Sequence, residues 1–478
     1  MNIDDSRHLL RRFAFAATPG AERAVRALAG DAAVASLVQA ARSAPIPAAP
    51  PDLRAPWTNT ALRLKDTPAA AYDAARAAQL RAHQQGTERL RQWWLGEMIG
   101  TAAPLRETMA LFFHNTFGSS SAAVEIPQAL HGCNALVRRR GLGTIPDLLE
   151  QLVLDPAMMI QIGMDEHFKA RVSDRPAKLI LDRWTVGPGA YTDTDVEELS
   201  RALTGWALAA PQGQLVIGAI DPTAPRVARR TGIVPLFDER QFDAGRKTIL
   251  GTTAAFDAKS AIARLARHPA TARRFGRLLI DYLGVEDLNG QLEGRLAETY
   301  LATDGSVEAL LLGIVRSNQF WAAESRWSVV KSPAQLLVGA CRQLGLTAPA
   351  LAGCSQWMTA AGQILFDTPS AGEGSWIGDE DWITPPDRLA IRYQLPSVLA
   401  GALPRTGFAP PAAAPPAATD LAVDGALRVA STGTLAERLD PAPGIELSAI
   451  ERATASAGAR RPAAILGRIM STPHYQLA

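Results

Sequence analysis

His114 and two aspartates are the residues of this sequence whose types could support acid/base or metal chemistry. Histidine titrates near neutrality, and histidine and carboxylate side chains supply the nitrogen and oxygen ligands that divalent metals take in proteins. We therefore treat His114, its neighbour Asn115, Asp182 and Asp243 as candidate catalytic residues. His114 and Asp182 are also candidate ligands of a divalent metal. These residues lie far apart along the chain, so only the fold can bring them together.

Structural roles for the same residues are the competing interpretation. A buried histidine whose ring nitrogens hydrogen-bond a carbonyl or a carboxylate is an ordinary core residue. Asp174, Lys178 and Asp182 are spaced four residues apart, as in a ladder of ion pairs along one helix. The sequence therefore predicts either an acid/base or metal site, or a set of internal polar contacts.

The element that must position His114 is a helix that begins at Pro104. Proline suits the first turn of a helix, and Gly118 with the serines after it should end the helix near Phe117. At 100° per residue, apolar side chains cover nearly the whole circumference of this helix. We therefore expect a buried helix with His114 inside the protein.

A second candidate site is the stretch from Gly372 to Trp382. Its tryptophans Trp376 and Trp382 flank Asp379, and an aromatic, acidic loop of this kind can line a pocket for a sugar or a cation. Trp206 is a further candidate binding residue. The alternative is an ordinary loop that buried tryptophans anchor.

The helix before Trp206 shows a capping pattern. Thr192 with Asp195 three residues later resembles a capping box, and an apolar stripe at helical spacing then runs as far as Trp206. Glu197 and Arg201 are four residues apart, which predicts an ion pair on the solvated face.

Other catalytic signatures are missing from the sequence. Glu373 stands where a nucleophile elbow around Ser375 would need glycine, and no Walker loop, dinucleotide fingerprint or zinc-protease motif occurs. The three cysteines are odd in number and lack Cys-x-x-Cys spacing, so we expect buried free thiols.

Charge and composition exclude several classes of partner. The chain has 478 residues, 47% of them hydrophobic, with 49 basic and 47 acidic side chains and a net charge of +2. This balance predicts neither nucleic-acid nor membrane binding. The apolar run after Arg11 and Arg12 is too short for an export signal, and no stretch could span a membrane, so we expect a cytoplasmic protein.

The periodicity predicts a mainly α protein, a multi-helix, bundle-like body with a small β-hairpin insertion. We divide the chain into an N-terminal helical segment, a Pro/Ala-rich linker, a helical core interrupted by the β-rich insertion, a Pro/Ala-rich strap, and C-terminal helices that dock on the core. The corresponding ranges are 1–42, 43–56, 57–211 with 257–403, 212–256, 404–421 and 422–478.

Several landmarks, in order along the chain, resemble the bacterial family called domain of unknown function 1800. They lie at residues 7–19, 104–115, 155–158, 189–193, 202–206, 243–251, 268–273 and 362–363. The resemblance implies an architecture and no mechanism. It also implies a protein partner, because relatives are often encoded beside a sulfatase-like protein.

Three positions depart from the pattern of that family. Thr116 stands in place of a second histidine, Phe242 in place of another, and Ser173-Asp174-Arg175 in place of an Asn-Glu-Asn run. We therefore expect a divergent member, a binding or assembly protein whose ancestral site is partly lost. The alternatives are an enzyme that uses His114 with Asp182 and Asp243, and a partner of the sulfatase-like protein.

Overall fold

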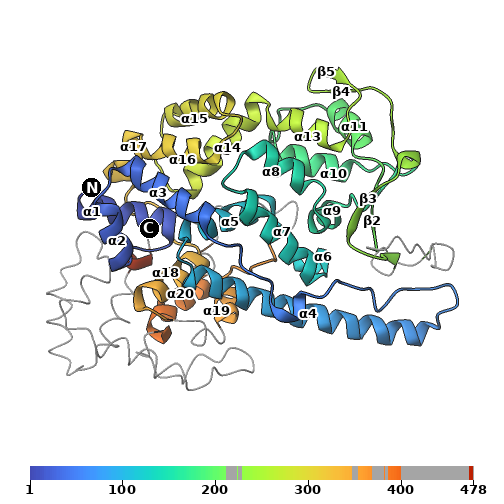
Figure 1. Cartoon of the computed structure of the whole chain (residues 1–478), viewed down its shortest axis with the longest axis horizontal. Coiled ribbons are helices and arrows are strands. Elements are labelled where there is room, and N and C mark those ends of the chain that lie inside the picture. Colours follow the sequence, from blue (N-terminus) through green and yellow to red (C-terminus); the bar gives the residue numbers. More distant parts are fainter. Residues whose placement is uncertain are drawn as a thin grey trace.

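The structure is a computed structural model that describes residues 1–210, 223, 229–346, 354–368, 382, 386–399 and 473–476. Figure 1 shows a helical body with two small sheets at one end. The protein is thus mainly α, as the sequence predicts. Within the described part of the chain, no helix is both long enough and apolar enough to cross a bilayer.

The first half of the chain supplies the helices from α1 to α11, and a short 3-10 turn at Pro51–Leu53 lies between the third and the fourth of them. They are α1 (Ile3–Ala14), α2 (Pro19–Arg26), α3 (Gly30–Ser43), α4 (Ala69–Gly100), α5 (Pro104–Phe117), α6 (Ser121–Val124), α7 (Pro127–Arg140), α8 (Ile145–Leu152), α9 (Pro156–Ile162), α10 (Asp174–Leu179), the π-helical turn Ile180–Trp184 and α11 (Asp193–Ala202).

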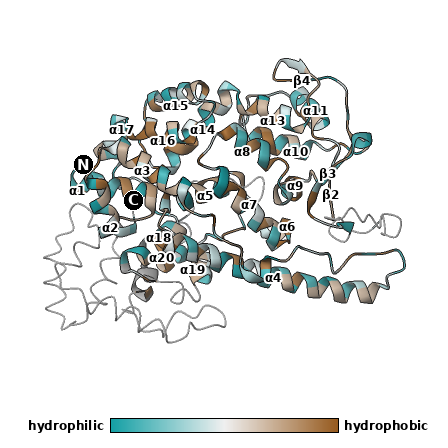
Figure 2. Ribbon diagram, in the orientation of Figure 1, coloured by the Kyte–Doolittle hydropathy of each residue, from teal (hydrophilic) through white to brown (hydrophobic). Residues whose placement is uncertain are grey.

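The second half continues the same body. Its helices are α13 (Ala258–Ala266), α14 (Pro269–Tyr282), α15 (Gln291–Ala302), α16 (Val307–Val315), α17 (Asn318–Trp321), α18 (Pro333–Leu344), α19 (Cys354–Ala360) and α20 (Pro386–Leu399), with 3-10 turns at Glu239–Gln241, Ala323–Ser325 and Pro473–Gln476. Apolar side chains from both halves form one contiguous core. In Figure 2, α16 is mostly brown, in keeping with its run of leucine, isoleucine and valine.

Helix α5 lies inside this body, as its sequence predicts. It begins at Pro104 and ends at Phe117, and every side chain in it except His114 is buried. Its neighbours are α1, α3, α4 and α7. Helix α4, in contrast, has 32 residues, and Figure 1 shows its N-terminal half extending beyond the other helices.

The β structure differs from the predicted insertion. A three-stranded antiparallel sheet joins β1 (Glu166–His167), β2 (Trp206–Ala209) and β3 (Val234–Phe237), so two of its strands precede residue 212. The hairpin of β4 (Lys247–Ile249) and β5 (Thr252–Ala254) lies where we expected one. Within the predicted insertion, residues 212–222 and 224–228 fall outside the described residues.

The helix that begins after Thr192 confirms one local prediction and corrects two. Thr192 and Asp195 form the capping box. The helix ends at Ala202, and Trp206 belongs to β2, because Gly205 has a φ of +92° that breaks the helix. The predicted Glu197–Arg201 ion pair is wrong, since Arg201 pairs with Glu198 at 2.7 Å and with Asp243 at 2.9 Å.

The last described segment, residues 473–476, packs against the body. Lys331 donates from its Nζ to the carbonyl of Tyr475 at 2.6 Å, and its backbone N–H donates to the carbonyl of Gln476 at 2.9 Å. The hydroxyl of Tyr475 donates to Gln343 on α18. The predicted strap at 404–421 and, apart from residues 473–476, the predicted C-terminal helices at 422–478 lie outside the described residues.

Candidate functional site

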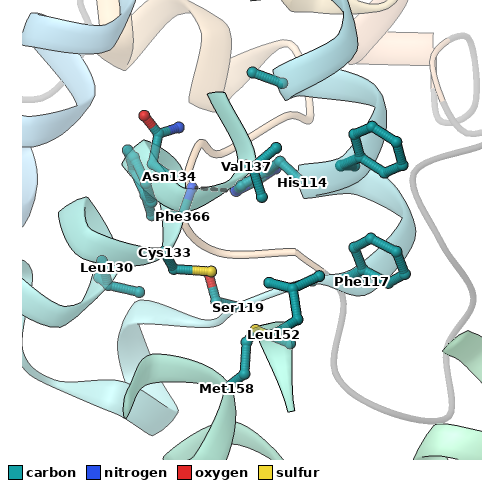
Figure 3. A pocket seen from close by; sticks show the side chains of 13 residues that line it. His114, Phe117, Ser119, Leu130, Cys133, Asn134, Val137, Leu152, Met158 and Phe366 are labelled. Carbon is teal, nitrogen blue, oxygen red and sulfur yellow. Dashed lines mark hydrogen bonds between the residues drawn. The ribbon is translucent and has the colours of Figure 1, made fainter. Parts of the chain in front are cut away.

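The imidazole of His114 lies between two aromatic rings. Its centroid is 5.1 Å from that of Trp94 on α4 and 5.6 Å from that of Phe366, both in edge-on geometry. Figure 3 shows the ring pointing toward the chain segment that carries Phe366. The side chain is partly exposed, so the prediction of a fully enclosed histidine is only approximately right.

Both ring nitrogens of His114 face a polar group. The Nε2 atom accepts a hydrogen bond from the backbone N–H of Phe366 at 3.0 Å, and Nδ1 lies 3.4 Å from Oδ1 of Asn115. An amide N–H can only donate, so Nε2 must be unprotonated and Nδ1 carries the hydrogen. Burial lowers the pKa of His114 to about 4, and the ring is therefore neutral at physiological pH.

The segment from residue 364 to residue 368 is held by several further contacts. The N–H of Ser121 donates to the carbonyl of Phe366 at 2.6 Å, and the hydroxyl of Ser120 donates to Asp367 at 2.7 Å. Phe366 itself has a φ of +59°, a conformation that non-glycine residues rarely adopt. The surrounding contacts must hold Phe366 in this conformation.

A small cavity lies beside His114. Its volume of about 20 Å³ leaves room for about one water molecule. Figure 3 shows the labelled side chains around it. The lining residues are Ala110, Phe113, His114, Phe117, Gly118, Ser119, Leu130, Cys133, Asn134, Val137, Leu152, Met158 and Phe366. Within the described structure, Oδ1 of Asn134 is buried without a hydrogen-bond partner, so it can bind such a water.

Burial disfavours the reactive form of the Cys133 thiol at this cavity. It hydrogen-bonds to the side chain of Asp155, which also accepts the N–H groups of Ala157 and Met158 at the start of α9. Burial raises the pKa of Cys133 well above its usual range and raises that of Asp155 to about 7. The thiolate, which is the nucleophilic form of cysteine, is therefore disfavoured.

The two candidate carboxylates have structural partners of their own. Asp182, in the π-helical turn, accepts from the hydroxyl of Tyr191 at 2.7 Å. Asp243 accepts from Arg201 through both oxygens, at 2.9 and 3.2 Å, and this hydrogen-bonded pairing lowers its pKa to about 2. Neither contact includes His114.

The alternative ion-pair ladder forms only in part. Asp174 and Lys178 pair at 3.8 Å on the exposed surface of α10, whereas Asp182 bonds to Tyr191 instead. Among the residues that the structure describes, no group of three or more His, Cys, Asp or Glu side chains is placed to hold a metal ion.

The predicted aromatic site is described only in part. Trp206 packs its ring 5.2 Å from that of Phe237 across the β2–β3 pair. Trp382 is 3% exposed and therefore resembles the buried anchor of the alternative interpretation. Trp376 and Asp379 lie outside the described residues.

One contact that we did not predict from the sequence is a buried ion pair next to Trp94. Arg138 on α7 donates to one oxygen of Glu107 on α5 at 2.6 and 3.2 Å, and the indole N–H of Trp94 donates to the same oxygen at 3.0 Å. Both charged side chains are fully buried. The signal was a glutamate in a helix that is otherwise apolar nearly all round, because such a charge must be paired inside the protein.

These features define a mainly helical protein in which one neutral histidine lies beside a small, mostly apolar cavity. The chain belongs to the family described as Protein of unknown function (DUF1800), whose model matches residues 8–477. Comparison with curated proteins and with solved structures gives no match.

Proposed function

We propose that this chain is a binding or assembly protein and that His114 has a structural role in it. The observation that carries the structural role of His114 is the hydrogen bond from the Phe366 N–H to its Nε2 atom. A general base or a metal ligand needs a free lone pair, and the only lone pair of this neutral ring is already engaged.

The size of the cavity supports the same conclusion. Pockets for small-molecule ligands usually have volumes of about 300–1,000 Å³. The cavity beside His114 has about 20 Å³, and apolar side chains make up most of its lining. The Nε2 atom of His114 becomes available to a substrate only if its hydrogen bond with the Phe366 N–H breaks.

The competing proposal is an enzyme that uses His114 with Asp182 and Asp243. The contacts of Asp182 with Tyr191 and of Asp243 with Arg201 do not favour it. Elemental analysis of the purified protein separates the two proposals. Stoichiometric metal that is lost in His114→Ala would support the enzyme, and equal metal contents in both proteins would support the structural role.

The partner that we propose is the sulfatase-like protein implied by the family resemblance. A surface that supports protein binding is the outer strand β3, where Val234, Leu236 and Phe237 are 42%, 44% and 38% exposed. Exposed apolar residues on an edge strand favour contact with another chain. We also propose a cytoplasmic location, which fractionation of the native host would test.

Affinity purification from the native host tests this proposal, with Leu236→Glu as the test variant. Leu288, 93% exposed in the turn before α15, provides the matched control Leu288→Glu. We expect the sulfatase-like protein to copurify with the wild type and with the control, and to be lost from Leu236→Glu. If the sulfatase-like protein copurified with none of the three proteins, the proposed partner would be overturned.

A further inference from the structure

A cleft lies on the surface of the helical body, apart from the His114 site. It is formed by α15, by the end of α16 and by the start of α17, and its volume is about 570 Å³. This volume lies within the range of small-molecule sites. The lining residues are Gln291, Arg295, Leu296, Thr299, Gly313, Arg316, Ser317, Asn318 and Gln319.

The charged side chains that line this cleft are all positive. Two of the lining residues, Arg295 and Arg316, are arginines, and none of the described residues that line it is acidic. The amides of Gln291, Asn318 and Gln319 add further N–H donors. A cluster of donors with a net positive charge selects for an anion and against a cation.

The two arginines are held in different ways. Arg295 on α15 donates to Oε1 of Gln319 at 3.1 Å, a contact that links α15 to α17 and orients the guanidinium group. Arg316 pairs with Asp31 on α3 at 3.2 Å, but both side chains are largely exposed, 63% and 43%. An exposed pair of this kind contributes little free energy, so an anionic ligand can compete with Asp31 for Arg316.

The floor of the cleft depends on a small residue. A Cβ atom at Gly313 would lie 2.9 Å from a methyl group of Leu296. The absence of a side chain at Gly313 leaves room for Leu296 where α15 packs against α16.

We propose that this cleft binds a small ligand with a tetrahedral oxyanion, a phosphate or a sulfate group. Guanidinium groups match the geometry of such oxyanions through paired N–H donors. A tetrahedral oxyanion offers more acceptor oxygens than a carboxylate does, which suits a site with two arginines and three amides. The cleft does not include His114 or β3, so this proposal is independent of the proposed function.

Calorimetric titration of the full-length protein with inorganic phosphate and, separately, with sulfate tests the proposal. We expect saturable binding of at least one anion with a 1:1 stoichiometry, and at least a tenfold weaker affinity in Arg295→Gln and in Arg316→Gln. The matched control is Arg277→Gln, an exposed arginine on α14 that pairs with Asp281 and does not line the cleft. The control should bind as the wild type does.

The variant Asp31→Asn should strengthen binding of the anion, whereas the two arginine variants should weaken it. It removes the carboxylate that competes for Arg316 and leaves both arginines in place, so the affinity for the anion should rise by about threefold. The proposal would be overturned by a lack of saturable binding for both anions. Equal weakening in Arg277→Gln and in the two cleft variants would overturn it as well.

Discussion

At the scale of single residues, the hydrogen bond between His114 and Phe366 joins positions 252 residues apart. His114→Ala would leave the Phe366 N–H without its acceptor, and we expect the free energy of unfolding to fall by about 1–3 kcal/mol. Hydrogen exchange of the Phe366 amide should become faster. In the control His131→Ala, which removes another histidine with a lowered pKa, this exchange should not change. An unchanged exchange rate in His114→Ala would contradict the structural role.

Asp155 gives a prediction about pH at the same scale. Burial raises its folded-state pKa to about 7, compared with about 3.9 in an unfolded chain. The folded state therefore binds more protons between these values, and the contribution of Asp155 to stability falls as the pH rises from about 4 to about 7. Asp155→Asn keeps an N-cap acceptor without the charge.

We therefore expect Asp155→Asn to gain stability relative to the wild type by about 2–3 kcal/mol between pH 5 and pH 8, measured by urea unfolding. The control is Asp147→Asn, at the exposed start of α8. If the difference between wild type and Asp155→Asn were the same at both pH values, the carboxyl of Asp155 would not titrate in this range.

At the scale of elements, the glycine at position 118 allows the end of α5 to pack closely against the chain segment that follows residue 363. Its φ is +62°, and a Cβ atom there would lie 2.5 Å from Oγ1 of Thr368. Gly118→Ala should therefore lower the free energy of unfolding by about 1–3 kcal/mol.

Part of the cost of Gly118→Ala comes from the contact with Thr368, so Thr368→Ala in the same chain should recover it. A double-mutant cycle with thermal or urea unfolding measures this coupling. Additive effects would show that the cost comes from the backbone conformation alone.

The elements also show what the sequence could predict. Pro104 and Gly118 fix the ends of α5 locally, and the capping box does the same for the start of α11. The pairing of β2 with β3, however, depends on residues about thirty positions apart, which no local pattern specifies.

In the candidate site, too, contacts between residues distant in sequence could not be predicted from local patterns. The choice of Asp243 as a partner of Arg201 depends on where the loop before β4 lies, whereas Glu198 is three residues away on the same helix. Residue type made His114 a candidate, but its partner Phe366 contributes a backbone N–H, which leaves no trace in the sequence.

At the scale of the whole molecule, four histidines should make the fold sensitive to acid. Burial lowers the pKa of His8 to about 2 and those of His83, His114 and His131 to about 4. Unfolded histidines titrate near 6.5, so the unfolded state binds more protons below that pH and stability is lost as the pH falls from about 6.5 toward 4. We expect a loss of at least about 1 kcal/mol per pH unit, measured by urea unfolding. A flat profile would contradict the burial of these rings.

Docking of residues 473–476 should stabilise the whole body. Tyr475 is 6% exposed and its ring lies 4.3 Å from Nζ of Lys331. Tyr475→Ala should lower the free energy of unfolding by about 2–4 kcal/mol. Tyr475→Phe keeps the ring and loses the hydrogen bond to Gln343, so it should cost only about 1 kcal/mol. Equal melting temperatures for Tyr475→Ala and the wild type would show that this contact does not support the fold.

The most direct test of the structural role of His114 is nuclear magnetic resonance of its ring nitrogens in protein labelled with ¹⁵N-histidine. His114→Ala assigns the signals by their disappearance. We predict an unprotonated Nε2, a protonated Nδ1, a pKa near 4 and no shift on addition of zinc or magnesium. A protonated Nε2, a titration near 6.5, or a shift on binding of either metal would contradict the account and would favour chemistry at His114.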